Sequence, residues 1–327
     1  MNKGKRILAT LAIPLLTFAV CEGICLLHGI RLFDTNTLNW LTYVRAVCNV
    51  ALVTYALSIN LNSGRFDFSI GSIALLSSVF SIQLTIKMNL GPYAMLALSL
   101  IFGLLLGLLS GIIYVSVKLP PMIVSLGVAL FYEGIAYSVT GGHGVSFINN
   151  RELLNFASIP RFLIIIALAL CFMIIVFDHT EFGYNYKALL SGQKVAVNTG
   201  INEKRNAVVC YAIAGLFMGA QGFVSATTTG SVQMALNFGS IGPMFMAFLP
   251  MFIGGYISRF ANDKAGYLLG AVSTSFLSLL YVRLMVNSSV QQVVSALLLV
   301  SFLIYLNNEG RLKQILHVKP KAEKGRA

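Results

Sequence analysis

The chain has 327 residues, of which 57% are hydrophobic and only 10% are charged. Because an ordinary soluble domain has about 25% charged residues, this composition cannot cover the surface of a soluble protein of this length. The mean hydropathy of +0.81 points the same way, so the sequence predicts a membrane protein.

Ten apolar segments are long enough to cross a bilayer, because about 20 helical residues span a hydrocarbon core about 30 Å thick. Continuous apolar runs without strict alternation are typical of helices rather than of barrel strands. The stretch 38–86 can be divided differently, so about nine to eleven spans are possible. The predicted fold class is all-α: a polytopic membrane protein with about ten transmembrane helices, at residues 7–27, 38–61, 70–86, 93–117, 122–139, 162–177, 207–225, 241–257, 267–285 and 290–306.

The basic residues are distributed unevenly between the two sides of this predicted bundle. With ten spans and an inside N-terminus, seventeen of the 23 lysine and arginine residues fall on one side and four on the other. Cytoplasmic loops carry such an excess, so both termini are predicted to be cytoplasmic. The net charge of +12 therefore indicates orientation in a lipid bilayer rather than nucleic-acid binding. We expect a transmembrane domain over residues 1–310 and a basic cytoplasmic tail over residues 311–327.

The first break in the apolar pattern is INLNSGRFDFSIGS, residues 59–72. An acid within the membrane is costly, and two interpretations of Asp67 are open. In the first, Asp67 accepts hydrogen bonds from free N–H groups where the next helix begins. In the second, Gly64 and Gly71 permit an unwound segment whose polar groups line a route for a solute. The candidate path residues are Asn60, Asn62, Gly64, Asp67, Ser69, Gly71 and Ser72, with Ser125 from a later span.

Glycine and proline mark two features in the following spans. Gly103, Gly107 and Gly111 recur every four residues, a pattern that lets another helix pack closely in lipid. The two prolines of KLPPM, residues 118–122, must interrupt a helix, because proline cannot donate a backbone hydrogen bond.

Two loops are long enough to have structure of their own. Residues 140–161 are predicted to lie outside and to contain a short helix near 151–157, capped by Asn149 or Asn150. Residues 178–206 are predicted to lie inside and form the longest polar segment between spans. Gly192 and Gly200 would permit turns at the ends of a short helix there.

Three blocks of the sequence resemble one known family, in that family's order. SGRFDFSIGSIALLSSV, from Ser63, is similar to the Gly-Gly-Ile-Asp-Leu-Ser-Val-Gly-Ser signature of the ribose-type (simple sugar) permeases of bacterial ABC importers. That family is related to the branched-chain amino-acid permeases. Residues 111–142 resemble its Leu-Pro-Pro-Phe-Ile-Val-Thr-Leu-Gly block with the closing Thr-Gly-Gly. Residues 180–224 resemble its large cytoplasmic loop and the helix that follows.

The sequence departs from the family pattern at four places. Ser63 replaces a glycine, Arg65 stands where the family is usually apolar, and Glu133 stands where many relatives have a basic residue. The second glycine-rich loop, normally Gly-Gly-x-Ser-Leu-x-Gly-Gly, reads GGYISRFA at residues 254–261. These changes concern the identity of the solute rather than the importer architecture.

The resemblance implies a transport subunit rather than an enzyme. The sequence has no GxxxxGK[ST] phosphate loop, so the chain is expected to hold no cofactor, with ATP bound and hydrolysed by a separate ABC ATPase subunit. Residues 178–206 match the family's coupling loop, in which a short helix would present Ala188, Leu189, Ala196 and Val197 to a groove of the ATPase. The residues at the matching coupling positions are Lys187, Ala188, Gly192, Ala196, Gly200 and Ile201.

Further partners follow from the same resemblance: an extracytoplasmic solute-binding protein and a second permease, in a homodimer or heterodimer. The solute is expected to be small and polar, a monosaccharide or nucleoside-like compound, and the location to be the bacterial plasma (inner) membrane. The alternative is a secondary transporter or channel driven by an ion gradient, with Asp67 and Glu133 as titrating sites. The charged residues within spans are expected to pair with one another: Glu22, Arg45, Glu133 and Arg283.

Overall fold

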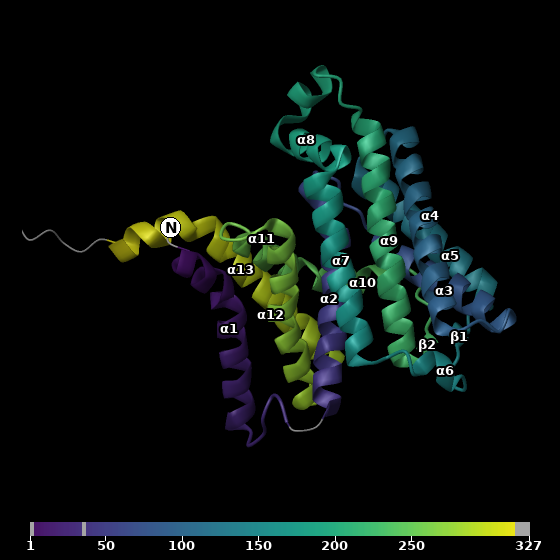
Figure 1. Cartoon of the computed structure of the whole chain (residues 1–327), viewed down its shortest axis with the longest axis horizontal. Helices are drawn as coiled ribbons and strands as arrows, with labels where there is room; N and C mark the ends of the chain where they lie inside the picture. Colours follow the sequence, from purple (N-terminus) through teal and green to yellow (C-terminus); the bar gives the residue numbers. More distant parts are fainter. Residues whose placement is uncertain (1–2, 35–36, 318–327) are drawn as a thin grey trace, which may run out of the picture.

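The computed structural model describes residues 3–34 and 37–317, which form a bundle of helices (Figure 1). The β-structure within this described part is one two-stranded antiparallel pair, with Val145 opposite Val232. The elements are α1 Lys3–Leu27, α2 Thr37–Asn62, α3 Ile70–Lys87, α4 Pro92–Val117, α5 Pro121–Thr140, β1 Val145–Ser146, α6 Arg151–Leu154, α7 Ile159–His179, α8 Glu181–Asn198, α9 Glu203–Thr229, β2 Ser231–Val232, η1 Gly239–Ile241, α10 Gly242–Met246, α11 Phe248–Ile257, α12 Asp263–Arg283 and α13 Ser288–His317.

Ten segments of the described chain are helical, long and apolar enough to cross a membrane. They coincide with the ten predicted spans, which confirms the all-α polytopic fold. The span at Gly239–Ile257 differs, because it consists of η1, α10 and α11 rather than one continuous helix. Pro250 explains part of this break. Proline is tolerated in the first turn of a helix, because the N–H groups of that turn have no partner within the helix. A new helix, α11, accordingly begins two residues before Pro250.

The helices α4 and α9 are packed with their backbones in close contact. A Cβ atom added at Gly103 would lie 2.4 Å from the carbonyl oxygen of Gly215, and one added at Gly107 would lie 2.4 Å from that of Tyr211. In the other direction, a Cβ atom added at Gly215 would lie 2.3 Å from the Gly103 carbonyl oxygen. The glycine stripe is therefore a helix-packing surface, as predicted from its spacing.

The helices α1 and α13 lie at the edge of the bundle, beside α11 and α12 and away from α3, α4 and α5 (Figure 1). α1 packs against α12 through the buried Cys21, Cys25 and Leu279. Most apolar side chains of α13 stay exposed, with Leu297 62% exposed, whereas Leu299 and Phe302 pack against α11. A helix that is apolar and uncovered over a membrane-spanning length is suited to contact with lipid.

Two of the predicted helix boundaries are found in the structure. α4 ends before the prolines and α5 begins at Pro121, with Lys118 between them in a left-handed conformation (φ 57°). Asn150 caps α6, since its side-chain oxygen accepts a hydrogen bond of 3.3 Å from the Leu153 N–H. This confirms one of the two predicted caps, although α6 ends at Leu154 rather than near residue 157.

One side of the bundle gathers the start of α1, the end of α13 and α8 (Figure 1). Arg6 Nε donates a hydrogen bond of 2.9 Å to the carbonyl oxygen of Phe260, so the start of α1 lies beside the turn between α11 and α12. An even number of spans places the two helix ends together, and the assignment of this side to the cytoplasm stays a prediction from charge. α13 continues to His317, and residues 318–327 of the predicted tail lie outside the described residues.

Candidate functional site

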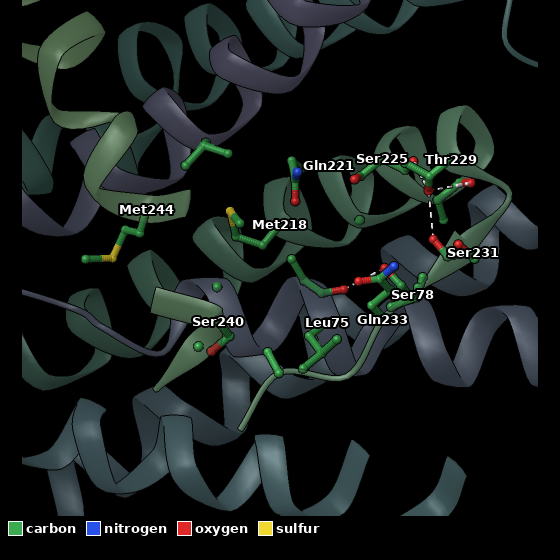
Figure 2. A pocket seen from close by; sticks show the side chains of 18 residues that line it. Leu75, Ser78, Met218, Gln221, Ser225, Thr229, Ser231, Gln233, Ser240 and Met244 are labelled. Atoms are coloured by element: carbon green, nitrogen blue, oxygen red, sulfur yellow. Dashed lines mark hydrogen bonds between the residues drawn. The ribbon is translucent and has the colours of Figure 1, made fainter. Parts of the chain in front are cut away.

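A cavity of about 340 Å³ lies inside the bundle, lined by residues of α2, α3, α9, β2, η1 and α10. Figure 2 shows Met218, Gln221, Ser225 and Thr229 following one another along α9, with Ser78 of α3 across the cavity. Because these α9 positions are three or four residues apart, they lie on one face of the helix. The cavity is thus formed by one face of α9, one face of α3 and the segment that returns from α9 to η1.

The polar groups of this cavity are hydroxyls and amides. Among its described lining residues none is charged and none is aromatic. Gln221 Nε2 donates a hydrogen bond of 3.3 Å to Asn49 Oδ1 of α2, which fixes one side of the Gln221 amide. Such a lining can exchange hydrogen bonds with a neutral polar solute but offers no counter-charge to an ion. The polar lining residues are Ser78, Gln221, Ser225, Thr229, Ser231, Gln233 and Ser240.

One wall of the cavity is held in place by Glu133 of α5, which is buried and does not itself line the cavity. Its carboxylate accepts hydrogen bonds from the N–H of Phe238 at 3.0 Å, and from the N–H and hydroxyl of Ser240 at 2.9 Å and 2.5 Å. The same wall is also in close contact with α3, because a Cβ atom added at Gly71 would lie 2.0 Å from the Ser240 carbonyl oxygen.

The expectation that the charged residues within spans pair with one another is wrong for three of them. Glu133 is satisfied by N–H groups at the start of η1, where the orientation of the backbone dipoles favours a negative charge. Glu22 accepts a hydrogen bond of 3.0 Å from the Leu32 N–H, and Arg283 Nε donates one of 3.0 Å to the Arg31 carbonyl oxygen. Backbone groups in loops supply the hydrogen-bond partners of these three side chains. The amino-acid composition did not indicate such partners.

Asp67 lies in the turn between α2 and α3 and is 2% exposed. Its Oδ1 accepts hydrogen bonds from the N–H and hydroxyl of Ser69 at 2.9 Å and 2.6 Å, and its Oδ2 accepts one of 3.1 Å from Asn60 Nδ2. Burial raises the pKa of the Asp67 carboxyl above its usual value, and these hydrogen bonds oppose that change. Ser69 immediately precedes α3, so Asp67 bonds to the residue before the helix and not, as the first interpretation expected, to an N–H group of its first turn.

The predicted path residues lie close to one another but mostly outside the cavity. Gly71 is among the residues that line it, and Gly64 makes the left-handed turn (φ 72°) after α2. The remaining side chains bond to nearby helices and turns: Asn62 to the Tyr267 hydroxyl, Ser72 to the Ser69 carbonyl oxygen, and Ser125 to the Met122 carbonyl oxygen.

The polar face of α9 was not among the path residues predicted from the sequence. Gln221 and Ser225 fall within or at the end of the apolar segment 207–225, and Thr229 continues the same helical spacing. Polar side chains that recur on one face of an otherwise apolar span were a signal that could have identified this wall.

The predicted inner loop 178–206 contains α8, which is interrupted at Gly192 (φ 177°, ψ 87°) and followed by Gly200 in a left-handed conformation (φ 96°). The two glycines therefore make the predicted turns. The predicted contact surface is partly wrong, because Leu189 and Ala196 are buried within the chain. Tyr186 shows why: its hydroxyl donates a hydrogen bond of 2.9 Å to the Ile59 carbonyl oxygen, so this face of α8 lies on the bundle. The apolar residues that α8 leaves exposed are Tyr184, Leu190, Val195 and Val197.

A cluster of charges connects α7, α8 and α12 at the same end of the bundle. Asp178 Oδ1 lies 2.6 Å from Lys187 Nζ of α8 and 3.2 Å from Lys264 Nζ of α12. Asp178 Oδ2 accepts a hydrogen bond of 3.0 Å from Asn262 Nδ2, and Lys264 also pairs with Asp263 at 2.7 Å. A single carboxylate thus joins Lys187 of α8 to the beginning of α12.

The family described as the permease component of the branched-chain amino acid transport system matches residues 40–308. The chain belongs to this family. The resemblance to the ribose-type permeases of ABC importers is confirmed.

The permease is similar to several curated import permeases. It is 26% identical to the fructose import permease protein of Rhizobium meliloti, in an alignment that covers 82% of this chain and 77% of the relative. It is 26% identical to the galactofuranose transporter permease protein of Escherichia coli strain K12, over 54% of this chain and 53% of the relative. It is 25% identical to the ribose import permease protein of Bacillus subtilis strain 168, over 60% and 62%. No solved structure matches the permease significantly.

The permease is therefore a transmembrane transport subunit, and its family and relatives do not favour the alternative of an ion-gradient carrier. The side chains that this alternative would titrate, Asp67 and Glu133, both hold backbone segments in place.

Proposed function

We propose that the permease forms the translocation path for a neutral monosaccharide in an ABC importer of the bacterial plasma membrane. The cavity between α3 and α9 supports this most directly, because hydroxyl and amide groups line it and no charge is present among its described lining residues. Relatives are named for the import of fructose, galactofuranose and ribose. A nucleoside fits less well, because the described lining residues include no aromatic ring on which a base would stack.

The α2–α3 turn would form the inner end of this path. Gly71 lines the cavity. From Gly71, the path would follow the predicted residues back to Asn60, toward the side of the bundle that carries α8. In this proposal Asp67 keeps the turn closed through Asn60 and Ser69, and the turn opens when the solute is released.

The cavity assignment predicts an effect of Gln221→Leu on solute affinity. Loss of one hydrogen-bonding group is expected to raise the KM for uptake up to about tenfold, since each 1.4 kcal/mol is a factor of ten, with little change in maximal rate. Labelled fructose and ribose would be tested in vesicles that contain the permease, its ATPase and its binding protein.

Gln83→Leu is the matched control, because Gln83 is an amide of α3 that lies outside the cavity. If the wild type and Gln221→Leu have equal KM values for every transported sugar, the cavity is not part of the translocation path.

The partner that supplies energy would be a separate ATPase subunit docked on α8. Val195 is 70% exposed, and Leu190 and Val197 are also exposed on this helix. Exposed apolar residues on a short helix suit a groove of a partner protein. Movement of α8 would reach α12 through Asp178, which contacts both Lys187 and Lys264. The solute-binding protein would dock on the opposite side, and a second permease would complete the path.

The docking assignment predicts that Val195→Asp prevents the ATPase from co-purifying with the permease. A charge buried at the interface is unfavourable, so recovery of the ATPase should fall at least about tenfold, the change that 1.4 kcal/mol produces. Val195→Thr, which keeps the shape of the side chain, should retain more of the association. Full recovery of the ATPase with Val195→Asp would show that α8 is not the dock.

The transport class itself is tested by the energy source. Uptake into vesicles should require ATP and should survive collapse of the proton gradient. Uptake that continues without ATP and stops when the gradient is removed would establish a secondary carrier instead.

A further inference from the structure

Arg65 is a buried cation that neither the packing nor the proposed path uses. It lies in the α2–α3 turn and is 5% exposed, and its Nη1 is buried without a hydrogen-bond partner. Within the described parts of the chain, no ion pair joins Arg65 to a carboxylate, and this includes Asp67 two residues later. Among the described residues, therefore, no carboxylate lies close enough to this buried guanidinium to form an ion pair with it.

A pocket of about 230 Å³ opens beside this guanidinium, between the α2–α3 turn, α8 and the start of α9. Gln193 of α8 adds an amide, and Leu189 and Leu190 make one side apolar. Glu203 at the start of α9 is the other charged residue among those that line it. The pocket has room for one small planar group, and a guanidinium matches the geometry of a carboxylate by donating two parallel hydrogen bonds.

We propose that this pocket is a carboxylate-binding site in which Arg65 is the principal ligand. A buried charge without a partner is unfavourable, and Arg65 is among the residues that line the pocket, so a carboxylate bound there would lie beside this side chain. The group can be a free carboxylate from solution or an acidic side chain of the docked ATPase. The site does not depend on the ATPase, and only its second source rests on the proposed function.

The site is tested on the full-length permease in detergent, with acetate as the probe. Thermal unfolding is followed while sodium acetate replaces sodium chloride at constant ionic strength. The wild-type melting temperature should rise with acetate and reach saturation, because a ligand that binds the folded state stabilises it. Arg65→Gln should lose the saturable rise, and Lys204→Gln, an exposed neighbour of the pocket, should keep it. A rise that is equal in the wild type and Arg65→Gln, or no saturable rise in the wild type, would overturn the site.

Glu203→Gln gives an independent test that keeps Arg65 in place. The Glu203 carboxylate repels a second carboxylate in the same pocket, so its removal should lower the acetate concentration at half-saturation by about threefold or more. A purely structural role of Arg65 would leave this concentration unchanged. An unchanged half-saturation would therefore contradict the proposal even if Arg65→Gln fails to fold.

The same titration on the permease–ATPase complex identifies the source. If an ATPase side chain fills the pocket, acetate should no longer stabilise the complex. If the natural ligand is a free carboxylate, the saturable rise should persist in the complex. Either outcome supports the site, and failure of the ATPase to associate would count against the proposed function while leaving the measurement on the permease alone intact.

Discussion

Replacement of Gly215 by leucine is expected to prevent the permease from reaching its folded state. A Cβ atom at this position would lie 2.3 Å from the Gly103 carbonyl oxygen and 2.7 Å from the Gly107 Cα. Both neighbours are backbone atoms of α4, so no side chain can turn aside to make room. Overpacking of a core costs about 3 kcal/mol or more when the backbone itself must move. The expected result is loss of the monodisperse peak in size-exclusion chromatography of the purified protein.

Gly127→Leu is the matched control for this substitution. Gly127 is also a helical glycine of a membrane span, but an added Cβ atom there would have no neighbour within 4 Å. This variant should purify and melt like the wild type. A Gly215→Leu protein with an unchanged elution profile and melting temperature would show that α4 and α9 are not packed through their glycines.

Replacement of Glu133 by leucine is expected to reduce uptake strongly while the protein still inserts into the membrane. The change leaves the N–H groups of Phe238 and Ser240 without their acceptors, and for the buried Ser240 group this costs about 1–3 kcal/mol. The segment that carries Ser240 is a wall of the cavity, so its release changes the shape of the proposed sugar site. Uptake at low sugar concentration should fall by about tenfold or more, the change that 1.4 kcal/mol produces.

Glu133→Gln separates the loss of charge from the loss of hydrogen bonds. Its amide oxygen can still accept from Ser240, whereas its NH₂ group cannot accept from Phe238, so an intermediate KM is expected. Glu152→Gln, on the exposed surface of α6, should behave like the wild type. If Glu133→Leu transports with a normal KM, the role assigned to Glu133 in positioning η1 is wrong.

The ten spans could be predicted from the sequence because membrane burial depends on local composition. Each helix needs its own apolar length, and Lys118 to Met122 shows that local chemistry also sets the ends. The glycine stripe at Gly103 and Gly107 was predictable for the same reason, since close packing in lipid leaves a regular spacing of small residues. Only the identity of the partner helix was missing.

The cavity and its walls could not be predicted in this way, because they depend on contacts between distant segments. Glu133 and Ser240 are far apart in the sequence, and no local pattern indicates that a carboxylate of one span holds a turn of another. Residues 59–72 also depend on contacts that the sequence does not reveal. Their polar character predicted a special segment correctly, but whether Asp67 faces a solute or a helix end depended on the position of Ser69.

The contact between α4 and α9 also restricts how the permease can change shape. Backbones that touch at Gly103 and Gly215, with no side chains between them, cannot slide past each other without collision. The two helices should therefore travel as one rigid body through the transport cycle. Shear is a small sliding of packed helices, and the contact between α2 and α9 is made through side chains such as Tyr55 and Phe217 rather than through touching backbones. Alternating access is accordingly expected to arise there, on the opposite flank of α9.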